Sequence, residues 1–142
     1  MKRVEIEVDG VVAEAELLEE NAPRTTAVFW DALPITTRLT HTIWSGRACG
    51  FSVERLRTVD ALEHGVCSIY PGTLIARPDM GEVLLSYGAA EYRSALGVQY
   101  GTRIARLVRN QAAMLTVLDR MHDEGDKTVS IRRTGGGSSG AG

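Results

Sequence analysis

The sequence predicts a mainly β protein: a closed barrel of about eight mostly antiparallel strands, with two helices that cap it. About eight short segments either alternate between apolar and polar residues or are rich in β-forming residues, and tight turns join most of them. Only two segments have the periodicity of a helix, so the strands follow one another mainly as hairpins. Closure into a barrel leaves no exposed edge on so many short strands.

The chain opens with a predicted β-hairpin. Apolar residues alternate with charged residues over residues 3–8, which is typical of a strand with one buried face. Asp9-Gly10 follows and is the strongest short-range signal for a hairpin turn. Alternation resumes over residues 12–17, where Glu14 and Glu16 take the outward positions. This pattern predicts two paired antiparallel strands.

A short amphipathic helix is predicted after the hairpin. Asn21 is a typical capping residue, and Pro23 suits the first turn, where a missing N–H costs nothing. Ala27, Trp30 and Leu33 recur at a spacing of three residues and so predict the buried face. A proline directly after Leu33 ends the helix.

The middle of the chain returns to strand patterns. Turn-forming sequences such as Ser45-Gly46 and Pro71-Gly72 separate short segments that are rich in β-forming residues. The stretch over residues 87–100 contains several small residues and predicts a long irregular loop. We expect strands at Leu39–Trp44, Ala48–Val53, Ser68–Tyr70, Thr73–Ala76, Glu82–Ser86 and Thr102–Val108.

A second helix, one more strand and a polar tail complete the predicted architecture. Asn110 is placed to cap the helix, and Gly125 lies where a helix-ending glycine is expected. Residues 127–132 alternate again and predict the last strand. From Thr134 the chain contains only Thr, Gly, Ser and Ala, so it has little to bury. We therefore expect one barrel domain over residues 1–133 and a disordered Gly/Ser tail over residues 134–142.

Composition and charge exclude several classes of function. The chain has 142 residues, enough for one domain with its own core, and a net charge of −2. Binding to nucleic acid or to an anionic membrane needs clustered positive charge, so we expect neither partner. The acidic, alternating start of the chain differs from a signal peptide, and no apolar run approaches the roughly 20 residues of a membrane span. We expect a cytoplasmic protein.

Metal and cofactor binding are not expected either. His41, His64 and His122 lack the short spacings of known metal motifs, and Cys49 and Cys67 form no Cys-x-x-Cys pair. Both cysteines are expected to be reduced and buried. A cysteine or serine nucleophile paired with His41 would need a nucleophile elbow, which the sequence around these residues does not contain. No catalytic residue is therefore assigned.

Three stretches of the sequence resemble cyclophilins, and the resemblance extends over about residues 3–132. They are the first helix (residues 21–30), a late strand (residues 101–108), and the second helix with the strand after it (residues 111–131). The chain is more similar to the small bacterial stand-alone cyclophilin-like proteins of unknown function. The residues that carry this second similarity are His41–Gly46, Tyr70-Pro71-Gly72 and Tyr87-Gly88.

The resemblance implies a cyclophilin-like barrel, whose best-known activity is peptidyl-prolyl isomerisation. Cyclophilins that catalyse it use an arginine on the strand after the first helix, and a Phe-Met-x-Gln stretch follows. Alignment places Thr42 at the arginine position, and threonine cannot supply a charged, forked donor. The residues from Ser45 to Phe51 contain no Phe-Met-x-Gln sequence. Prolyl isomerase catalysis of this kind is therefore not expected.

Candidate ligand-binding residues come from the segments between the two helices. Histidine changes charge near neutral pH, and tyrosine combines a flat apolar face with a hydroxyl. A carboxylate and a guanidinium near them would suit a carboxylate or amide ligand. His41 and Trp44 are three residues apart on a predicted strand, so we expect them on opposite faces unless a bulge intervenes. The alternative for each candidate is an ordinary structural role in the barrel. The candidates are His41, Trp44, Tyr70, Glu82, Tyr87 and Arg93.

These residues predict a small-ligand-binding or partner-binding module without classical prolyl isomerase catalysis. Its ligand would be a small carboxylate or amide, and no cofactor is expected. One alternative is an enzyme that acts on amide or cyclic-amide metabolites, because cyclophilin-like folds occur in enzymes such as the allophanate hydrolase subunits. A second alternative is a weak prolyl isomerase. A homodimer is a reasonable expectation for a small bacterial barrel.

Overall fold

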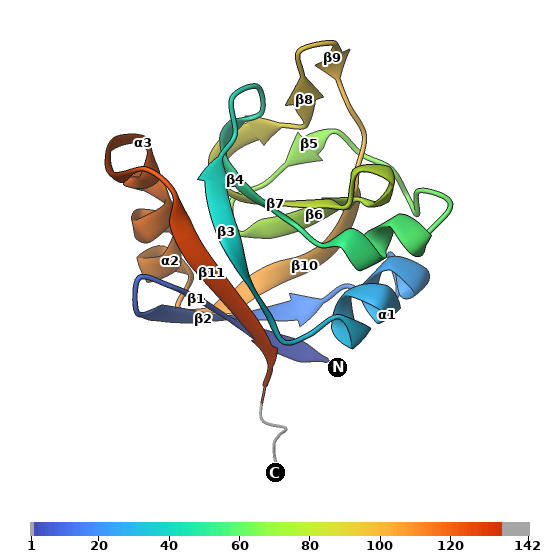
Figure 1. Ribbon diagram of the computed structural model, residues 1–142, viewed down its shortest axis with the longest axis horizontal. Helices are drawn as coiled ribbons and strands as arrows, with labels where there is room; N and C mark the ends of the chain where they lie inside the picture. The colour runs from blue at the N-terminus through green and yellow to red at the C-terminus, as the bar shows by residue number, and fades with distance from the viewer. Residues whose placement is uncertain (1, 135–142) are drawn as a thin grey trace.

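A computed structural model, which describes residues 2–134, contains an eight-stranded closed barrel (Figure 1). Its strands are β1 (Arg3–Val8), β2 (Val11–Leu17), β3 (Ile35–His41), β4 (Gly46–Ser52), β6 (Thr73–Arg77), β7 (Glu82–Glu91), β10 (Thr102–Arg109) and β11 (Lys127–Arg133). In the order β4-β3-β11-β1-β2-β10-β6-β7, each strand is antiparallel to the next, and β4 also pairs with β7 to close the ring. The predicted closed antiparallel barrel is confirmed. Apart from its first residue, the predicted tail lies outside the described residues.

Shorter elements extend the barrel. The short strand β5 (Ser68–Ile69) pairs with the end of β7, and β8 (Arg93–Ser94) pairs with β9 (Gly97–Val98) as a separate hairpin. This hairpin projects from the same side of the molecule as the connection between β3 and β4 (Figure 1). Two 3-10 helices, η1 (Glu54–Thr58) and η2 (Pro78–Met80), lie in the connections that lead to β5 and to β7.

The N-terminal hairpin forms as predicted. Asp9 and Gly10 both have a positive φ, 52° and 78°, which a tight two-residue turn of this kind requires. Val4, Ile6 and Val8 are fully buried. Every second side chain of β1 therefore enters the core, and a slip of one residue would expose all three.

The helix α1 (Pro23–Asp31) lies where the sequence predicts it, but Asn21 does not cap it. The Asn21 side chain instead donates to the main-chain carbonyl of Arg103 at 2.9 Å. The carboxylate of Glu63, from a distant loop, accepts from the Thr25 main-chain N–H at 2.8 Å and from its hydroxyl at 2.7 Å. Burial raises the pKa of Glu63, but these hydrogen bonds outweigh burial and hold the pKa below its usual value. A carboxylate brought from elsewhere in the chain thus stabilises the helix N-terminus.

The buried face of α1 also differs from the prediction. Phe29 faces the core together with Thr25 and Thr26, whereas Ala27 is exposed and Trp30 is only partly buried. The Thr26 hydroxyl donates to a main-chain carbonyl one turn earlier at 2.7 Å, so its burial leaves no unpaired group. The basic side chains of Lys2 and Arg133 lie over the Trp30 ring at the surface.

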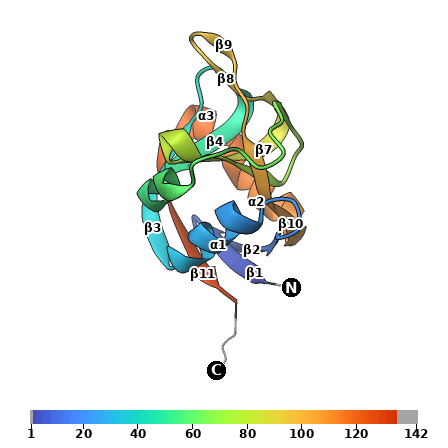
Figure 2. The ribbon, with the colours of Figure 1, turned by 90° about the vertical axis from the view of Figure 1, so that its right-hand side faces the viewer.

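The second predicted helix consists of two helices, α2 (Gln111–Asp119) and α3 (Met121–Glu124), with a break at Arg120. Asn110 has a left-handed conformation, φ 59°, and its side chain donates to the Val12 carbonyl at 2.9 Å instead of capping α2. Helix α1 covers one end of the barrel, and α2 and α3 cover the other (Figures 1 and 2). Within the described residues, the model has no helix that combines the length and the apolar character needed to cross a membrane.

Strand β7 is longer than predicted. It continues to Glu91 because its second half pairs with β5 and with the start of β4. Gly88 and the two alanines after it conceal the alternation of this segment, so the predicted loop over residues 87–100 is wrong in its first part. In contrast, β3 ends at His41, before the predicted end of the strand at Trp44.

Apolar side chains form a large cluster inside the barrel and a small one outside it. The inner cluster includes side chains from every barrel strand and from all three α-helices. The outer cluster consists of Ile69, Ile75, Leu84 and Tyr92, and it lies on the outer face of β6 and β7. Adjacent side chains of β7 point to opposite faces of the sheet, so Leu84 belongs to the outer cluster and Leu85 to the inner one. Tyr92 of the outer cluster donates a hydrogen bond to the candidate residue Glu82.

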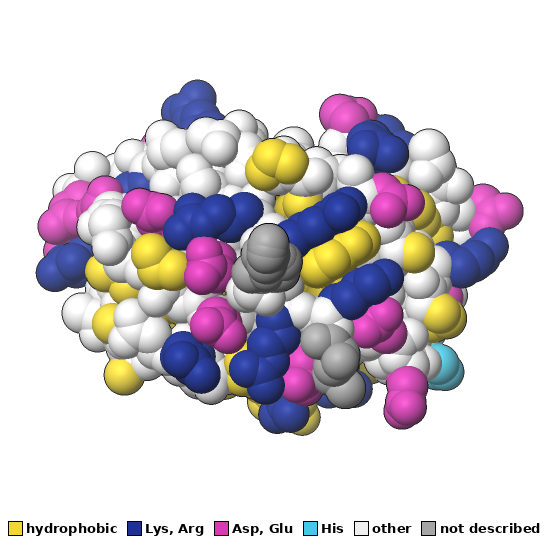
Figure 3. Space-filling model, turned by 90° about the horizontal axis from the view of Figure 1, so that it is seen from below, with side chains coloured by type: hydrophobic (Ala, Val, Ile, Leu, Met, Phe, Trp, Pro, Cys, Tyr) yellow, Lys and Arg dark blue, Asp and Glu magenta, His cyan; other side chains and the backbone are white. Residues whose placement is uncertain are grey.

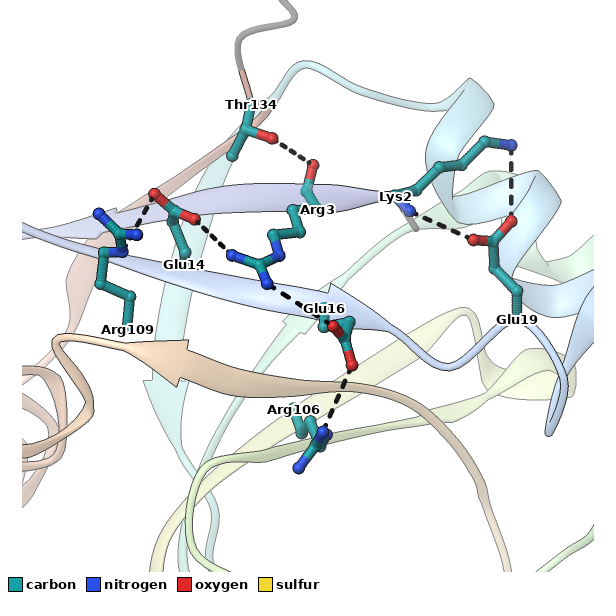
Figure 4. A network of polar contacts seen from close by, with 8 residues as sticks. All are labelled: Lys2, Arg3, Glu14, Glu16, Glu19, Arg106, Arg109 and Thr134. Carbon is teal, nitrogen blue, oxygen red and sulfur yellow. Dashed lines mark hydrogen bonds and ion pairs between the residues drawn. The ribbon is translucent and has the colours of Figure 1, made fainter.

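Ion pairs cover the outer face of β1, β2 and β10, which we call the charged face. Acidic and basic side chains are interspersed on the underside of the molecule (Figure 3). Glu16 lies 3.4 Å from Arg106 and 3.8 Å from Arg3, and Glu14 lies 3.7 Å from Arg109 (Figure 4). Since the arginines are exposed, each pair adds little to stability. These arginines nevertheless all have carboxylate partners.

Candidate functional site

Four of the six candidate residues meet at one cavity on the outside of the barrel. His41, Trp44, Glu82 and Arg93 line a cavity of about 220 Å³, which we call the outer pocket. The other two candidates lie elsewhere. Convergence of distant residues on one cavity is the arrangement that a binding site requires.

Three separate segments build the outer pocket. The connection between β3 and β4 supplies Trp44, the start of β7 supplies Glu82, and β8 supplies Arg93. Leu84 of β7 and Gly50 of β4 also line it and lie opposite each other in register. A Cβ at Gly50 would come 2.7 Å from the Leu84 Cδ2, so the glycine allows Leu84 to pack closely across the sheet.

Ser45 holds the β3–β4 connection against the β8–β9 hairpin. Its hydroxyl accepts a hydrogen bond from the Arg93 main-chain N–H at 3.1 Å and donates to the Arg93 carbonyl at 3.1 Å. The Ser45 carbonyl accepts from the Glu91 N–H at 3.0 Å. Ser45 is buried, so water does not compete with these bonds. The main chain that presents Trp44 and Arg93 is therefore tied together.

The outer pocket contains one carboxylate and one guanidinium. The Arg93 Nε donates to Glu91 Oε1 at 2.9 Å, and both side chains remain well exposed. The Glu82 Oε1 accepts a hydrogen bond from the Tyr92 hydroxyl. Burial raises the pKa of Tyr92, and the hydrogen bond to Glu82 raises it further, so the phenol stays a donor. No hydrogen bond within residues 2–134 engages the other carboxylate oxygen of Glu82, which leaves it available to a ligand.

Exposed apolar side chains lie at the rim of the outer pocket. Trp44 is 55% exposed and Ile43 is 83% exposed. Because β3 ends at His41, the expectation that His41 and Trp44 lie on opposite faces of one strand does not apply. An exposed indole beside a cation and a carboxylate offers a flat apolar face to a planar ligand.

His41 and Tyr87 form a hydrogen-bonded pair at the barrel end, which we call the inner pair. The His41 Nε2 lies 2.7 Å from the Tyr87 hydroxyl, and the Nδ1 lies 2.7 Å from the Thr42 carbonyl oxygen. A carbonyl only accepts, so Nδ1 donates to Thr42, and in this tautomer Nε2 accepts from the Tyr87 hydroxyl. The His122 ring lies 4.0 Å from the His41 ring, and burial raises the pKa of Tyr87. Both ring nitrogens of His41 are thus engaged within the protein.

Cys49 is poorly suited to act as a nucleophile beside His41. It lies opposite His41 in the pairing of β3 and β4, is fully buried, and contacts the Met121 sulfur at 3.5 Å. Burial raises the pKa of its thiol to about 12, so thiolate is scarce at neutral pH. Cys67 is free as well but only partly buried, contrary to the expectation for both cysteines. The described residues also contain no group of three or more His, Cys, Asp or Glu side chains that could hold a metal ion.

Tyr70 does not join the outer pocket. It is 62% exposed and lines a different cavity, of about 410 Å³, together with Tyr100 and Arg103. The prediction grouped Tyr70 with the other candidates because all come from the same part of the chain. In the barrel, Tyr70 follows β5 and lies beside the start of β10, not beside the outer pocket.

Sequence reasoning missed three residues that shape the outer pocket. The sequence indicates a turn at Ser45 and offers it as a nucleophile. Its role in holding the β8–β9 hairpin depends on its hydrogen bonds to the main chain of Arg93, which is distant in sequence. Tyr92 lies in the predicted loop and is not among the candidates; it is buried and donates to Glu82, a contact that the sequence does not indicate. The alternation of β7 is the signal that could have placed Leu84 on the outer face, but apolar residues on both faces obscure it.

The fold is shared with other proteins of known structure. One is described as the structure of McbB in complex with tryptophan, with a TM-score of 0.75 and 17% sequence identity, over 93% of this chain and 45% of that chain. This chain therefore spans less than half the length of the McbB chain. Another is the solution structure of the hypothetical protein AF2241 from Archaeoglobus fulgidus, with a TM-score of 0.65 and 19% identity, over 94% of this chain and 95% of that chain. At these identities the likeness concerns the fold alone.

Sequence comparison places the chain in a family. No curated protein matches it. The family described as "Protein of unknown function (DUF3830)" matches residues 4–132, which include all barrel strands except the ends of β1 and β11. The chain belongs to this DUF3830 family.

Proposed function

We propose that this chain is a cyclophilin-like small-ligand-binding module, which holds a carboxylate or amide ligand in the outer pocket. The observation that carries the proposal is the convergence of Trp44, Glu82 and Arg93, from three separate segments, on one cavity. The cavity, at about 220 Å³, is smaller than the sites that hold drug-sized ligands, which favours a small ligand.

The chemistry of the outer pocket supports this ligand class. The indole of Trp44 provides a face for a planar or apolar group. The guanidinium of Arg93 can bind a carboxylate or an amide oxygen, and the free oxygen of Glu82 can accept from an amide N–H or an ammonium group. One neighbour in fold is described as a complex with tryptophan, a small aromatic carboxylate, so tryptophan is a natural first compound to test.

The same pocket argues against prolyl isomerase catalysis. Thr42, at the position of the catalytic arginine of cyclophilins, lines the outer pocket and is uncharged. Its hydroxyl donates to the Gly46 carbonyl at 3.4 Å, within its own turn. The neighbouring guanidinium, Arg93, comes from a different segment and pairs with Glu91. We therefore propose ligand binding rather than proline isomerisation.

A thermal-shift screen tests the proposal. The compounds are tryptophan, benzoate, benzamide, succinimide and urea, each with the unmodified chain. A ligand that binds only the folded state raises stability, by about 2.7 kcal/mol when its concentration is 100 times its Kd. We expect at least one compound to raise the Tm, and expect Trp44→Ala and Arg93→Gln each to reduce that rise. Leu96→Ala, at the exposed tip of the β8–β9 hairpin, is the matched control and should retain it.

Two results would contradict the proposal. One is that neither pocket variant reduces the rise in Tm with any compound, because every ligand would then bind elsewhere. The other is that no compound raises the Tm.

Incubation of a bound compound with the chain, followed by product analysis, separates a binding module from the alternative enzyme that acts on amides or cyclic amides. A proline-peptide assay at high protein concentration tests the weak isomerase.

A partner protein is a second candidate occupant of this surface, and a specific observation favours it. Ile43 and Leu96, at the tips of the two connections that Ser45 ties together, are 83% and 94% exposed. Exposed large apolar side chains at neighbouring tips are a feature of docking surfaces. Under this alternative, which includes a homodimer, Ile43→Ser together with Leu96→Ser would abolish association in sedimentation velocity. A chain that stays monomeric at all concentrations would exclude the homodimer.

A further inference from the structure

Arg103 on β10 differs from the other arginines of its strand. Its Nε is buried and has no hydrogen-bond partner among residues 2–134. Arg106 and Arg109 lie further along the same strand and pair with Glu16 and Glu14 on the charged face (Figure 4). No ion pair within the described residues involves Arg103. A partly buried cation without a counter-charge is costly, and such a group requires an explanation.

Arg103 lines a cavity of about 410 Å³ that is separate from the outer pocket. The lining residues also include Tyr70, Tyr100 and Ser68, whose hydroxyls can donate a hydrogen bond. Cys67 lines the cavity as well, but its thiol donates to Glu91 Oε2 at 3.9 Å. Neither Asp nor Glu is among the described residues that line the cavity. The lining residues thus combine one fixed positive charge with three hydroxyl donors and include no acidic residue.

The cavity is held open by main-chain hydrogen bonds. The Val66 N–H donates to the Gly101 carbonyl at 2.8 Å, and the Gly101 N–H donates to the Val66 carbonyl at 2.9 Å. The Tyr92 N–H donates to the Cys67 carbonyl at 2.7 Å. A Cβ at Gly101 would come 2.9 Å from the Ala76 carbonyl oxygen, so only glycine fits there. The loop that faces Arg103 is therefore bound to Gly101, directly before β10, and to Tyr92, so a ligand would enter a preformed site.

We propose that this cavity, which we call the Arg103 cavity, binds the oxyanion group of a small aromatic compound, a carboxylate or a phosphate. The guanidinium of Arg103 supplies the charge and a planar fork of donors that matches an oxyanion. Tyr70 and Tyr100, which are 62% and 51% exposed, supply ring faces at the mouth of the cavity for the aromatic part. The proposal is independent of the outer pocket, since the two cavities share no lining residue.

Calorimetric titrations of the full chain carrying Trp44→Ala, which removes the aromatic face of the outer pocket, test this proposal. The probes are benzoate, phenyl phosphate and inorganic phosphate, with benzamide as the uncharged analogue of benzoate. We expect benzoate or phenyl phosphate to bind, and benzamide to bind at least tenfold more weakly, because it lacks the charge that Arg103 recognises. The first two probes distinguish a carboxylate from a phosphate. Inorganic phosphate that binds as tightly as phenyl phosphate would contradict a role for the tyrosines.

Three variants locate the binding. Arg103→Met keeps the aliphatic stem and removes the charge, so it should weaken binding at least tenfold with the Tm unchanged or raised. Arg106→Gln, on the same strand but on the charged face, should bind like the parent chain. Arg93→Gln, in the outer pocket, should also leave this binding intact, which separates the two sites.

Each of three outcomes would overturn the proposal. The first is that no oxyanion produces heat of binding. The second is that benzoate and benzamide bind with equal affinity, and the third is that Arg103→Met leaves the affinity unchanged. If Arg103→Met instead lowers the Tm and the parent chain binds none of the probes, the role of Arg103 is structural.

Discussion

The inner pair and the outer pocket share His41 but differ in how their other polar groups are satisfied. In the inner pair, both ring nitrogens of His41 have partners within the protein, and Tyr87 is buried. In the outer pocket, Trp44 is largely exposed, Arg93 remains accessible, and one oxygen of Glu82 is unengaged among the described residues. The inner pair thus has the features of a structural contact, and the outer pocket has those of a binding site.

This difference shows what residue type alone does not reveal. Histidine and tyrosine serve catalysis, binding and packing equally well, so their presence in a sequence does not distinguish these roles. Burial with complete internal hydrogen bonding indicates a structural role, whereas spare hydrogen-bonding capacity at a cavity indicates a ligand. The following predictions test this distinction through the stability and the binding of variants.

The largest expected effect contrasts Tyr87→Ala with Trp44→Ala. Removal of the buried Tyr87 ring leaves a cavity and should lower the free energy of unfolding by about 3–5 kcal/mol. Removal of the exposed Trp44 ring should change it by less than about 0.5 kcal/mol. Urea denaturation measures both values. A loss for Trp44→Ala as large as that for Tyr87→Ala would mean that the outer pocket is part of the structural core.

A smaller effect is expected when only the inner hydrogen bond is removed. Tyr87→Phe keeps the ring but leaves the His41 Nε2 without its donor, which should cost about 1–2 kcal/mol of unfolding free energy. A double-mutant cycle with His41→Leu isolates the coupling between the two residues. If the coupling energy is near zero, the hydrogen bond contributes nothing and the inner pair is not a structural contact.

Alkaline pH provides a third test of the inner region. The folded protein holds the Cys49 proton up to about pH 12, whereas the unfolded chain releases it near the ordinary pKa of 9.0. The contribution of Cys49 to stability is therefore fully present below pH 9 and is lost as the pH rises from 9 toward 12, with a loss on the order of 1 kcal/mol by pH 10. Denaturation curves of the parent chain and of Cys49→Ala at pH 8 and pH 10 measure this difference. An equal pH dependence in the two proteins would show that Cys49 is not buried as described.

The smallest effect on stability is expected from Arg93→Gln in the outer pocket. The ion pair of Arg93 with Glu91 is exposed, so its loss should change the free energy of unfolding by less than about 0.5 kcal/mol. The same substitution should weaken an anionic ligand of the outer pocket about tenfold. Thermal denaturation with and without the ligand measures both. A large loss of stability without a change in affinity would reverse the roles assigned to the two regions.

Most of the barrel follows from local patterns in the sequence. The alternation of β1, the Asp9-Gly10 turn and the pairing of short strands suffice to predict an antiparallel barrel. The errors arise where distant contacts decide the outcome. Asn21 and Asn110 bond to main-chain carbonyls of β10 and β2 rather than capping their helices, and Glu63 from a distant loop binds the start of α1.

The candidate site was predicted only in part. The outer pocket includes His41, Trp44, Glu82 and Arg93, but Tyr70 lies at another cavity. The prediction depended on proximity along the chain, whereas the barrel brings together residues by strand order. For the same reason the sequence gives no indication that Arg103 lacks a partner, since the carboxylates that could pair with it come from other strands.

The most direct test of the outer pocket as a binding site is the fluorescence of Trp44. The chain has two tryptophans, so Trp30→Phe leaves Trp44 as the sole indole reporter. Arg103→Met is added to this variant so that the Arg103 cavity contributes no binding of oxyanions. A ligand without an indole, such as benzoate or benzamide, is then titrated into it, and its affinity is measured in parallel by calorimetry. We predict a saturable change in Trp44 emission with the same Kd by both methods. Binding heat without any change in Trp44 emission would place the ligand elsewhere and contradict the account.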